Sequence, residues 1–115
     1  MAVTVTIWHN PRCTKSRQTL ALLRERGIEP AIRLYLEDAP SRDELLAASR
    51  ALGLPPSGMV RRGEALFREL GLSDAGDDAL LDAMAEHPKL IERPVVFTDR
   101  AAALGRPPEN VLALF

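Results

Sequence analysis

The most reactive side chain in this 115-residue sequence is its single cysteine, Cys13, in the segment WHNPRCTKSR (residues 8–17). That segment joins a predicted strand to a predicted helix, so the thiol would face the unpaired N–H groups and positive dipole end of the helix. Arg12, Lys15 and Arg17 add positive charge nearby. Because each feature favours thiolate over thiol, the pattern predicts a nucleophile rather than a buried structural cysteine, which is the commoner fate of a lone thiol.

The features that favour a thiolate also attract an oxyanion. The backbone N–H groups of Thr14, Lys15 and Ser16, together with a guanidinium, would hold a phosphate-like group beside the sulfur of Cys13. We therefore expect these three residues to bind substrate, with an oxyanion as the substrate class.

Spacing excludes two narrower interpretations of this loop. A low-molecular-weight tyrosine phosphatase needs an arginine six positions after its cysteine, and that position here holds Thr19. A dithiol oxidoreductase needs Cys-x-x-Cys, and the fourth position here is Ser16. With one thiol in the chain, no internal disulfide or cysteine-rich zinc site can form, and Cys13 must be regenerated by an external thiol.

Three arginines at the ends of predicted elements are further candidates: Arg61, Arg93 and Arg106. In the fold that the order of the predicted elements indicates, the strand that starts at Pro94 begins beside the first helix, so Arg93 is expected to reach the thiol. The alternative is that these are solvated surface arginines, since 13 of the 15 basic residues are arginine. No histidines and carboxylates stand at metal-ligand spacing, so we predict no metal site.

The elements that would position these residues begin with a β-α-β unit. Alternating β-branched residues predict a strand over 3–8, a helix follows over 14–26 and stops at Gly27, and a second strand covers 32–36. A strand, a helix and a second strand in this order form a β-α-β unit, which predicts that the two strands are parallel.

The middle of the chain is predicted to be helical and the last third returns to strand. Ser41 and Glu44 form a capping box that starts a helix ending at Gly53. The other predicted elements are helices over 59–70 and 77–86 (the latter capped by Asp77 or Asp78), strands over 94–98 and 101–104, and a helix over 109–114. This order predicts an α/β fold of thioredoxin-like type, a mixed four-stranded sheet with a helical insertion; the alternative is an unrelated small α/β sandwich.

Composition narrows the class of protein. A formal charge of −1 lacks the basic field of a general nucleic-acid binder, and 46% apolar residues suffice for a folded core. The N-terminal residues lack a basic, apolar signal sequence, and no apolar run approaches the roughly 20 residues that cross a bilayer. We expect a cytoplasmic protein without nucleic-acid or membrane partners. No exposed apolar stripe stands out, so a monomer is expected.

The chain closely resembles the glutaredoxin-coupled arsenate reductase (ArsC) family over about residues 3–114. The resemblance is carried by HNPRC (9–13), SR (16–17), YL (35–36), MVRR (59–62), ELGL (69–72), HPKLIERP (87–94) and GRP (105–107).

The resemblance implies one domain over residues 1–115, with a thioredoxin-like core at about 1–36 and 90–115 and a helical insertion at about 40–88. It implies that Cys13 is the nucleophile and that the three arginines at 61, 93 and 106 bind the oxyanion. His9 would tune the thiolate, Arg17 would support the loop, and a cis bond is expected before Pro94.

The activity implied is reduction of arsenate to arsenite, with glutathione as co-substrate, glutaredoxin as partner protein and no bound cofactor. Cys13 would attack arsenate, and glutathione and glutaredoxin would complete the reduction.

Two other functions stay open. One is a glutathione-dependent monothiol transfer protein, with which Ser16 is compatible but which has no need of three arginines around an oxyanion. The other is a redox regulator that binds RNA polymerase, a class also found in the family. Its redox-sensing forms use Cys-x-x-Cys, so Ser16 counts against it.

Overall fold

The structure, a computed structural model, describes residues 4–115. Its helices and strands are β1 (Thr6–Trp8), α1 (Thr14–Glu25), β2 (Ala31–Arg33), α2 (Arg42–Leu52), α3 (Ala65–Glu69), α4 (Asp77–Glu86), β3 (Val95–Phe97) and β4 (Ala102–Leu104). Short 3₁₀ helices are η1 (Pro56–Gly58), η2 (Leu72–Asp74), η3 (Pro88–Leu90) and η4 (Pro108–Leu114). Each predicted strand is present but shorter than predicted, and Val3 lies outside the described residues.

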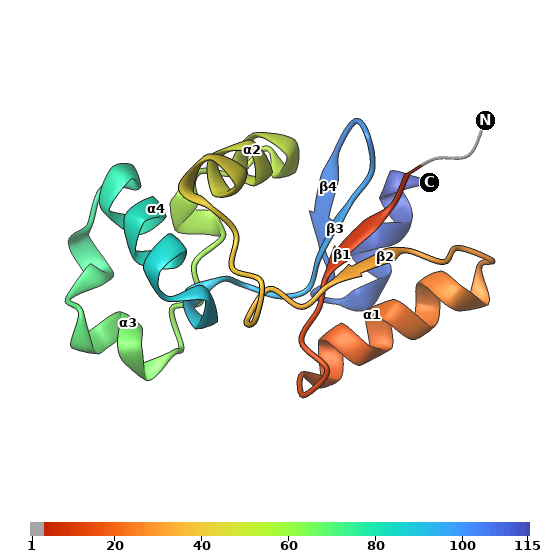
Figure 1. Cartoon of the computed structure of the whole chain (residues 1–115), viewed down its shortest axis with the longest axis horizontal. Helices are drawn as coiled ribbons and strands as arrows, with labels where there is room; N and C mark the ends of the chain where they lie inside the picture. The colour runs from red at the N-terminus through yellow and green to blue at the C-terminus, as the bar shows by residue number, and fades with distance from the viewer. Residues whose placement is uncertain (1–3) are drawn as a thin grey trace. The chain divides into compact units, whose positions relative to one another are not determined.

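The four strands form one mixed sheet in the order β2-β1-β3-β4 (Figure 1). β1 pairs with β2 in parallel, with Ile7 opposite Ile32, as the β-α-β pattern predicts. β3 pairs antiparallel with both β1 and β4. This is the predicted thioredoxin-like sheet, and it brings the start of β3 next to the end of β1, because Val95 is the register partner of Trp8.

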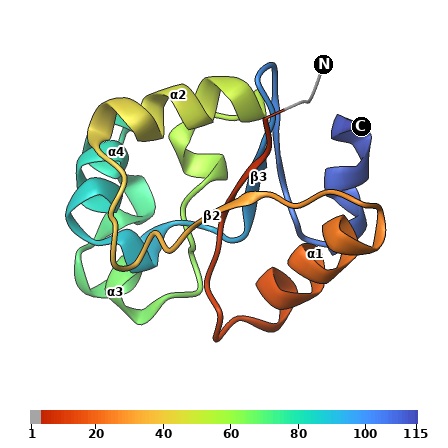
Figure 2. The same ribbon diagram turned by 45° about the vertical axis from the view of Figure 1, so that its right-hand side comes forward.

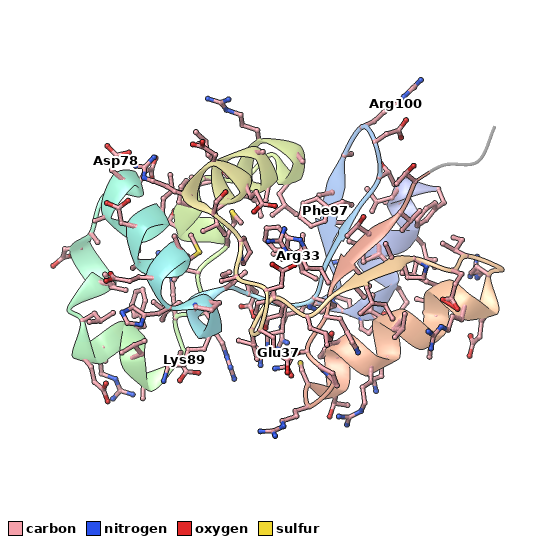
Figure 3. The ribbon with its side chains drawn as sticks, in the orientation of Figure 1. Arg33, Glu37, Asp78, Lys89, Phe97 and Arg100 are labelled. Atoms are coloured by element: carbon pink, nitrogen blue, oxygen red, sulfur yellow. The ribbon has the colours of Figure 1, made fainter. Side chains whose placement is uncertain are left out.

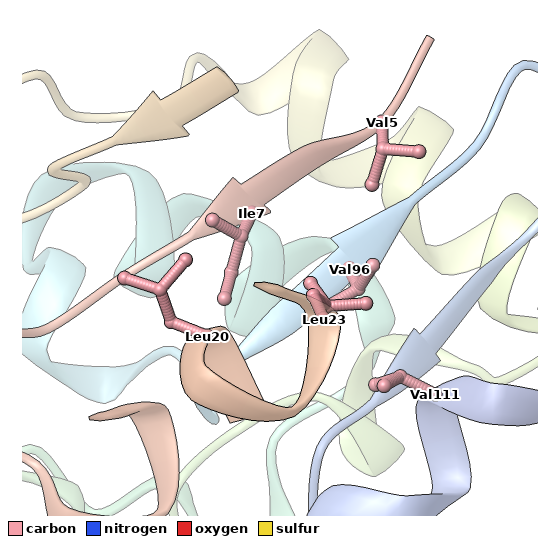
Figure 4. Packing of buried hydrophobic residues seen from close by; sticks show 6 residues of the cluster. All are labelled: Val5, Ile7, Leu20, Leu23, Val96 and Val111. Atoms are coloured by element: carbon pink, nitrogen blue, oxygen red, sulfur yellow. The ribbon is translucent and has the colours of Figure 1, made fainter. Parts of the chain in front are cut away.

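One face of the sheet is covered by α1 and η4, which lie side by side (Figures 1 and 2). The core between them is apolar and almost fully buried; its cluster consists of Val5, Ile7, Leu20, Leu23, Val96 and Val111 (Figure 4). Leu20 and Leu23 are one helical turn apart, so α1 presents a single stripe to the sheet. On the opposite face of β1 and β3, the rings of Trp8 and Phe97 pack at a tilt of 53°, with 4.8 Å between their centroids.

The chain divides into two compact units. The first consists of residues 1–38 and 93–115 and contains the sheet, α1 and η4; the second consists of residues 39–92 and contains α2, α3 and α4. The prediction of one domain with an insertion at about 40–88 stays a prediction. Among the described residues, none of the helices has the length and apolar character needed to cross a membrane.

The second unit is built on α2 packed against α4. The predicted capping box is confirmed, because Ser41 Oγ accepts from the Glu44 amide at 3.1 Å while Glu44 Oε1 accepts from the Ser41 amide at 3.0 Å. Gly53 ends α2 with φ +68°, a conformation that favours glycine. Arg42 bridges to Asp78 and Asp82 on α4, at 2.6 and 2.7 Å.

Three helical predictions need correction. The helix predicted over 59–70 is only α3, because the backbone before it pairs with another segment: the Arg61 amide donates to Leu90 O at 2.6 Å, and Val60 bridges Ile91. Neither aspartate predicted to cap α4 does so; Gly76 is the N-cap and both lie in the first turn. The last helix is a 3₁₀ helix, which fits a start at two prolines that lack N–H groups.

Candidate active site

Cys13 is held at the N-terminus of α1 by a tight turn. Its amide donates to Asn10 O at 3.0 Å, and the Arg12 amide donates to Asn10 Oδ1 at 3.0 Å. Asparagine is favoured in such turns because its side chain substitutes for a backbone acceptor. Cys13 is therefore the N-cap residue of α1, with extended backbone (φ −93°, ψ 122°), and its thiol is partly exposed to solvent.

The surroundings of the Cys13 thiol favour the thiolate. Burial alone would raise the pKa, but it is outweighed by the Ser16 amide, the charge of Arg93, the Lys15 amide and a hydrogen bond from the Arg93 side chain, so the pKa lies below its usual value. The thiol makes no capping hydrogen bond in the resting geometry, whereas a charged sulfur is stabilised by the same N–H groups. A partly exposed thiolate with a neighbouring guanidinium can act as a nucleophile.

Ser16 and His9 form a buried pair beneath the loop. Ser16 Oγ lies 2.6 Å from His9 Nδ1 and accepts from the Asn10 amide at 3.0 Å. Ser16 has no exposed surface and His9 is 6% exposed. Burial, together with the charges of Arg24 and Arg17, lowers the pKa of His9, so the imidazole is neutral at pH 7. The pair therefore fixes the loop through a neutral hydrogen bond and places no charge beside the thiol.

The remaining residues of the loop divide into those that face the thiol and those that hold the loop. The Lys15 amide contributes to the low pKa of Cys13. Arg17 holds the loop instead: Nη1 donates to Pro11 O at 2.9 Å and Nη2 to Thr14 Oγ1 at 3.2 Å. The Arg17 guanidinium and the Thr14 hydroxyl are therefore both used in hydrogen bonds within the loop.

Two of the three predicted arginines lie in the same unit as the thiol. Arg93 contacts Cys13 as predicted, and Arg106 Nη1 donates to Arg93 O at 3.4 Å. The Arg93–Pro94 bond is cis, as predicted, and Arg106–Pro107 is also cis, which sequence reasoning did not predict. Cys13, Arg93 and Arg106 are therefore brought together by three segments of the first unit.

Arg61 belongs to the second unit and is paired within it. Its Nη1 lies 3.2 Å from Glu64 Oε2, and the other oxygen of that carboxylate lies 4.0 Å from Lys89 Nζ. The resemblance alone assigns Arg61 to the oxyanion.

Sequence reasoning missed two residues that shape this site, Thr19 and Gly105. Thr19 is fully buried, and Oγ1 donates to Lys15 O at 2.8 Å. Gly105 donates its amide to Pro94 O at 3.0 Å, and a Cβ added to it would lie 2.5 Å from Thr19 Oγ1 and 2.7 Å from Pro94 Cγ. The sequence held part of the signal for Gly105, because this glycine directly precedes the candidate Arg106. Its contact with Thr19, however, joins residues 86 positions apart, which no local pattern reveals. Over residues 4–115, histidine, cysteine and carboxylate side chains form no cluster able to hold a metal.

Comparison with known proteins agrees with the geometry. The ArsC family profile matches residues 8–114. An arsenate reductase of Neisseria meningitidis is 47% identical over 96% of this chain and 97% of its own length. A protein of Escherichia coli K12 named YfgD, without a named activity, is 44% identical over 99% of this chain and 98% of its own. A solved structure of an arsenate reductase from Vibrio cholerae is 52% identical, covers all of both chains and superposes with a TM-score of 0.96.

Proposed function

The chain belongs to the ArsC family, and on that premise we propose that it is an arsenate reductase in which Cys13 is the nucleophile and glutathione and glutaredoxin supply the electrons. The observation that carries the proposal is the lowered pKa of a lone, partly exposed thiol at the start of α1, next to Arg93. Relatives named arsenate reductase, similar over nearly the whole chain, indicate the substrate.

The site suits a tetrahedral oxyanion. Arsenate would take its hydrogen bonds from the first amides of α1, at Thr14, Lys15 and Ser16, and its charge compensation from Arg93 and Arg106. Arg61, the third arginine assigned by the resemblance, would have to exchange its ion pair with Glu64 for the substrate. Donors fixed by a helix start need no reorganisation as charge develops, which is the basis of electrostatic catalysis.

The first step forms a sulfur–arsenic bond. The Cys13 thiolate donates its electron pair to arsenic, and a protonated oxygen of arsenate leaves as water, which gives a thiolate-bound As(V) adduct. Arsenic is not reduced in this step and remains As(V). The lowered pKa of Cys13 favours this step, because the thiolate and not the thiol is the effective nucleophile.

The reduction needs thiols from outside the chain, because Cys13 is the only cysteine. A glutathione thiolate displaces a second arsenic oxygen as water. The thiolate of glutaredoxin then attacks the glutathionyl sulfur, forming a disulfide with it, and the pair of the broken sulfur–arsenic bond stays on arsenic, which becomes As(III). Hydrolysis of the remaining bond to Cys13 releases arsenite and restores the thiol.

A coupled assay tests this function. NADPH oxidation is followed with glutathione, glutaredoxin and glutathione reductase, with and without arsenate. We expect arsenate-dependent turnover that is abolished in Cys13→Ser and falls about 10²-fold or more in Arg93→Ala, the usual effect of removing one donor to a developing anion. Arg100→Ala is the matched control, because Arg100 lies at the tip of the β3–β4 hairpin (Figure 3).

The assay also separates the alternatives. Arsenate-independent turnover with a small mixed disulfide, combined with no response to arsenate, would replace the reductase by monothiol transfer. Equal arsenate turnover in wild type and Arg93→Ala would refute the role of that arginine.

A further inference from the structure

Thr19 lies in the second turn of α1, behind the loop that presents Cys13, and no step of the proposed reaction uses it. Its side chain is fully buried, and Oγ1 donates to Lys15 O at 2.8 Å. A threonine in a helix often bonds to the carbonyl four residues earlier, so this bond alone indicates no function. Two further features distinguish Thr19: the peptide group that it holds, and the backbone packed against its other side.

The peptide group that Thr19 holds is the one whose amide acts most strongly on the thiol. The carbonyl of Lys15 and the amide of Ser16 belong to the same peptide plane. Burial raises the pKa of Cys13, and the Ser16 amide is the largest of the influences that lower it, ahead of the charge of Arg93. Because a peptide plane is rigid, a hydrogen bond to its oxygen also fixes the direction of its N–H group. The same bond polarises the peptide and makes that N–H group a stronger donor.

Gly105 is packed against the other side of the Thr19 hydroxyl. Gly105 O lies 3.5 Å from Thr19 Oγ1, and a Cβ added to Gly105 would lie 2.5 Å from the same atom. Gly105 is in turn joined to the segment that follows Arg93, because its amide donates to Pro94 O at 3.0 Å. Contacts from outside α1 therefore confine the hydroxyl beside the carbonyl that it bonds.

We propose that Thr19 is a positioning residue for the nucleophile: its hydroxyl orients the Lys15–Ser16 peptide so that the Ser16 amide points at the Cys13 sulfur. Thr19 acts through that peptide and not by contact with the reacting atoms. The Ser16 amide is also one of the three that would bind the oxyanion, and only for this second use does the inference rest on the proposed function.

The other groups that act on the sulfur are known, so the effect of Thr19 can be separated from theirs. Arg93 contributes its charge and a hydrogen bond, and the Lys15 amide contributes a further hydrogen bond. His9, beneath the loop, is neutral at pH 7 because burial lowers its pKa. An effect of Thr19 that persists without Arg93 would therefore act through the backbone amides.

The experiment measures the rate at which iodoacetamide alkylates Cys13, the only cysteine, as a function of pH in the full chain. The thiolate displaces iodide and forms a thioether, so the midpoint of the profile gives the pKa of Cys13. Thr19→Ser and Thr19→Ala are the matched pair, because both lack the γ-methyl group and only serine keeps the hydroxyl. Thr98→Ala is the control, because that hydroxyl also donates to a backbone carbonyl, Ala101 O at 3.3 Å, but follows the end of β3 remote from Arg93.

We expect the midpoint to rise by about half a pH unit in Thr19→Ala, as weakening one hydrogen bond to the thiolate requires, which lowers the thiolate fraction about threefold below the midpoint. Thr19→Ser and Thr98→Ala should keep the wild-type midpoint, and the rise should persist when Arg93→Ala is the background. Circular dichroism checks folding, and Thr19→Val, which also lacks the hydroxyl, replaces Thr19→Ala if that variant does not fold.

Three outcomes would overturn the assignment: an unmoved midpoint in the variant without the hydroxyl, an equal rise in Thr19→Ser or Thr98→Ala, or loss of the rise in the Arg93→Ala background. The assay contains no arsenate, glutathione or glutaredoxin. Its outcome is therefore independent of whether the chain reduces arsenate.

Discussion

Replacing Gly105 by alanine tests whether close packing behind the active site determines its stability. Gly105 is buried where β4 leads to Arg106, and the added Cβ would lie 2.5 Å from Thr19 Oγ1, 2.7 Å from Pro94 Cγ and 3.1 Å from Thr19 Cγ2. Carbon atoms in well-packed interiors sit near 3.5–4.0 Å apart, so α1, the Pro94 turn or both must move.

The expected loss follows from those contacts. Overpacking by one methyl group costs about 1–3 kcal/mol, and two rigid neighbours at under 3 Å place this site in the upper half of that range, about 2–3 kcal/mol. An unfolding entropy of about 2.1 cal/mol/K per residue gives about 0.24 kcal/mol/K for 115 residues, so Tm should fall by about 8–12 °C.

The assay is urea unfolding followed by circular dichroism, with thermal melts alongside. Gly63→Ala is the matched control, because a Cβ there meets nothing within 4 Å and the backbone is not left-handed; its stability should change by less than about 0.5 kcal/mol. In a Thr19→Ala background, which removes two of the three close contacts, Gly105→Ala should cost less. A loss below about 0.5 kcal/mol for Gly105→Ala, or an equal loss in both backgrounds, would refute the packing argument.

Three further predictions concern the thiol, its buried neighbour and the second unit. Arg93→Ala removes a charge and a hydrogen bond that lower the pKa of Cys13, so the midpoint of the pH profile of alkylation should move to higher pH; an unmoved midpoint contradicts this. Burial holds the pKa of His9 below 6.5, so the contribution of His9 to stability is complete above pH 6.5 and is lost as the pH falls through the folded-state pKa. The difference in unfolding free energy between pH 7 and pH 5 should therefore shrink in His9→Gln. An unchanged difference would contradict this reasoning. Ser41→Ala deletes half of the capping box with Glu44 and should cost about 1 kcal/mol in urea unfolding, whereas a neutral result would mean that the cap is replaced by solvent.

The sequence predicted the elements whose signals are local. The capping box predicted the start of α2, and Gly27 and Gly53 marked helix ends with left-handed backbone. Runs rich in β-branched residues located β1 and β3, and the turn at Asp99 and Arg100 indicated β4. The failure at residues 59–64 has a tertiary cause. Met59 and Arg61 use their backbone groups to pair with residues 90–92, and no local pattern records a partner that far along the chain.

The same distinction holds for the candidate site. The residue types and the helix start were enough to predict the thiolate, and the fold class was enough to predict the contact from Arg93. The sequence could not show which side chains already make hydrogen bonds within the loop. Arg17 donates hydrogen bonds to Pro11 and Thr14 and so holds the loop, although it lies only four residues after Cys13 in the sequence.

Ser16 bears on the proposed need for an external thiol. In a dithiol enzyme this position holds the resolving cysteine, but here the side chain is fully buried and its oxygen is used twice, by His9 Nδ1 and by the Asn10 amide. A thiol at this position would be a weaker partner for both groups and would loosen the turn that presents Cys13. The structure of the loop therefore depends on the same residue that leaves the turn without a resolving thiol, so under the proposed function the second thiol would have to approach from the surface beside the turn.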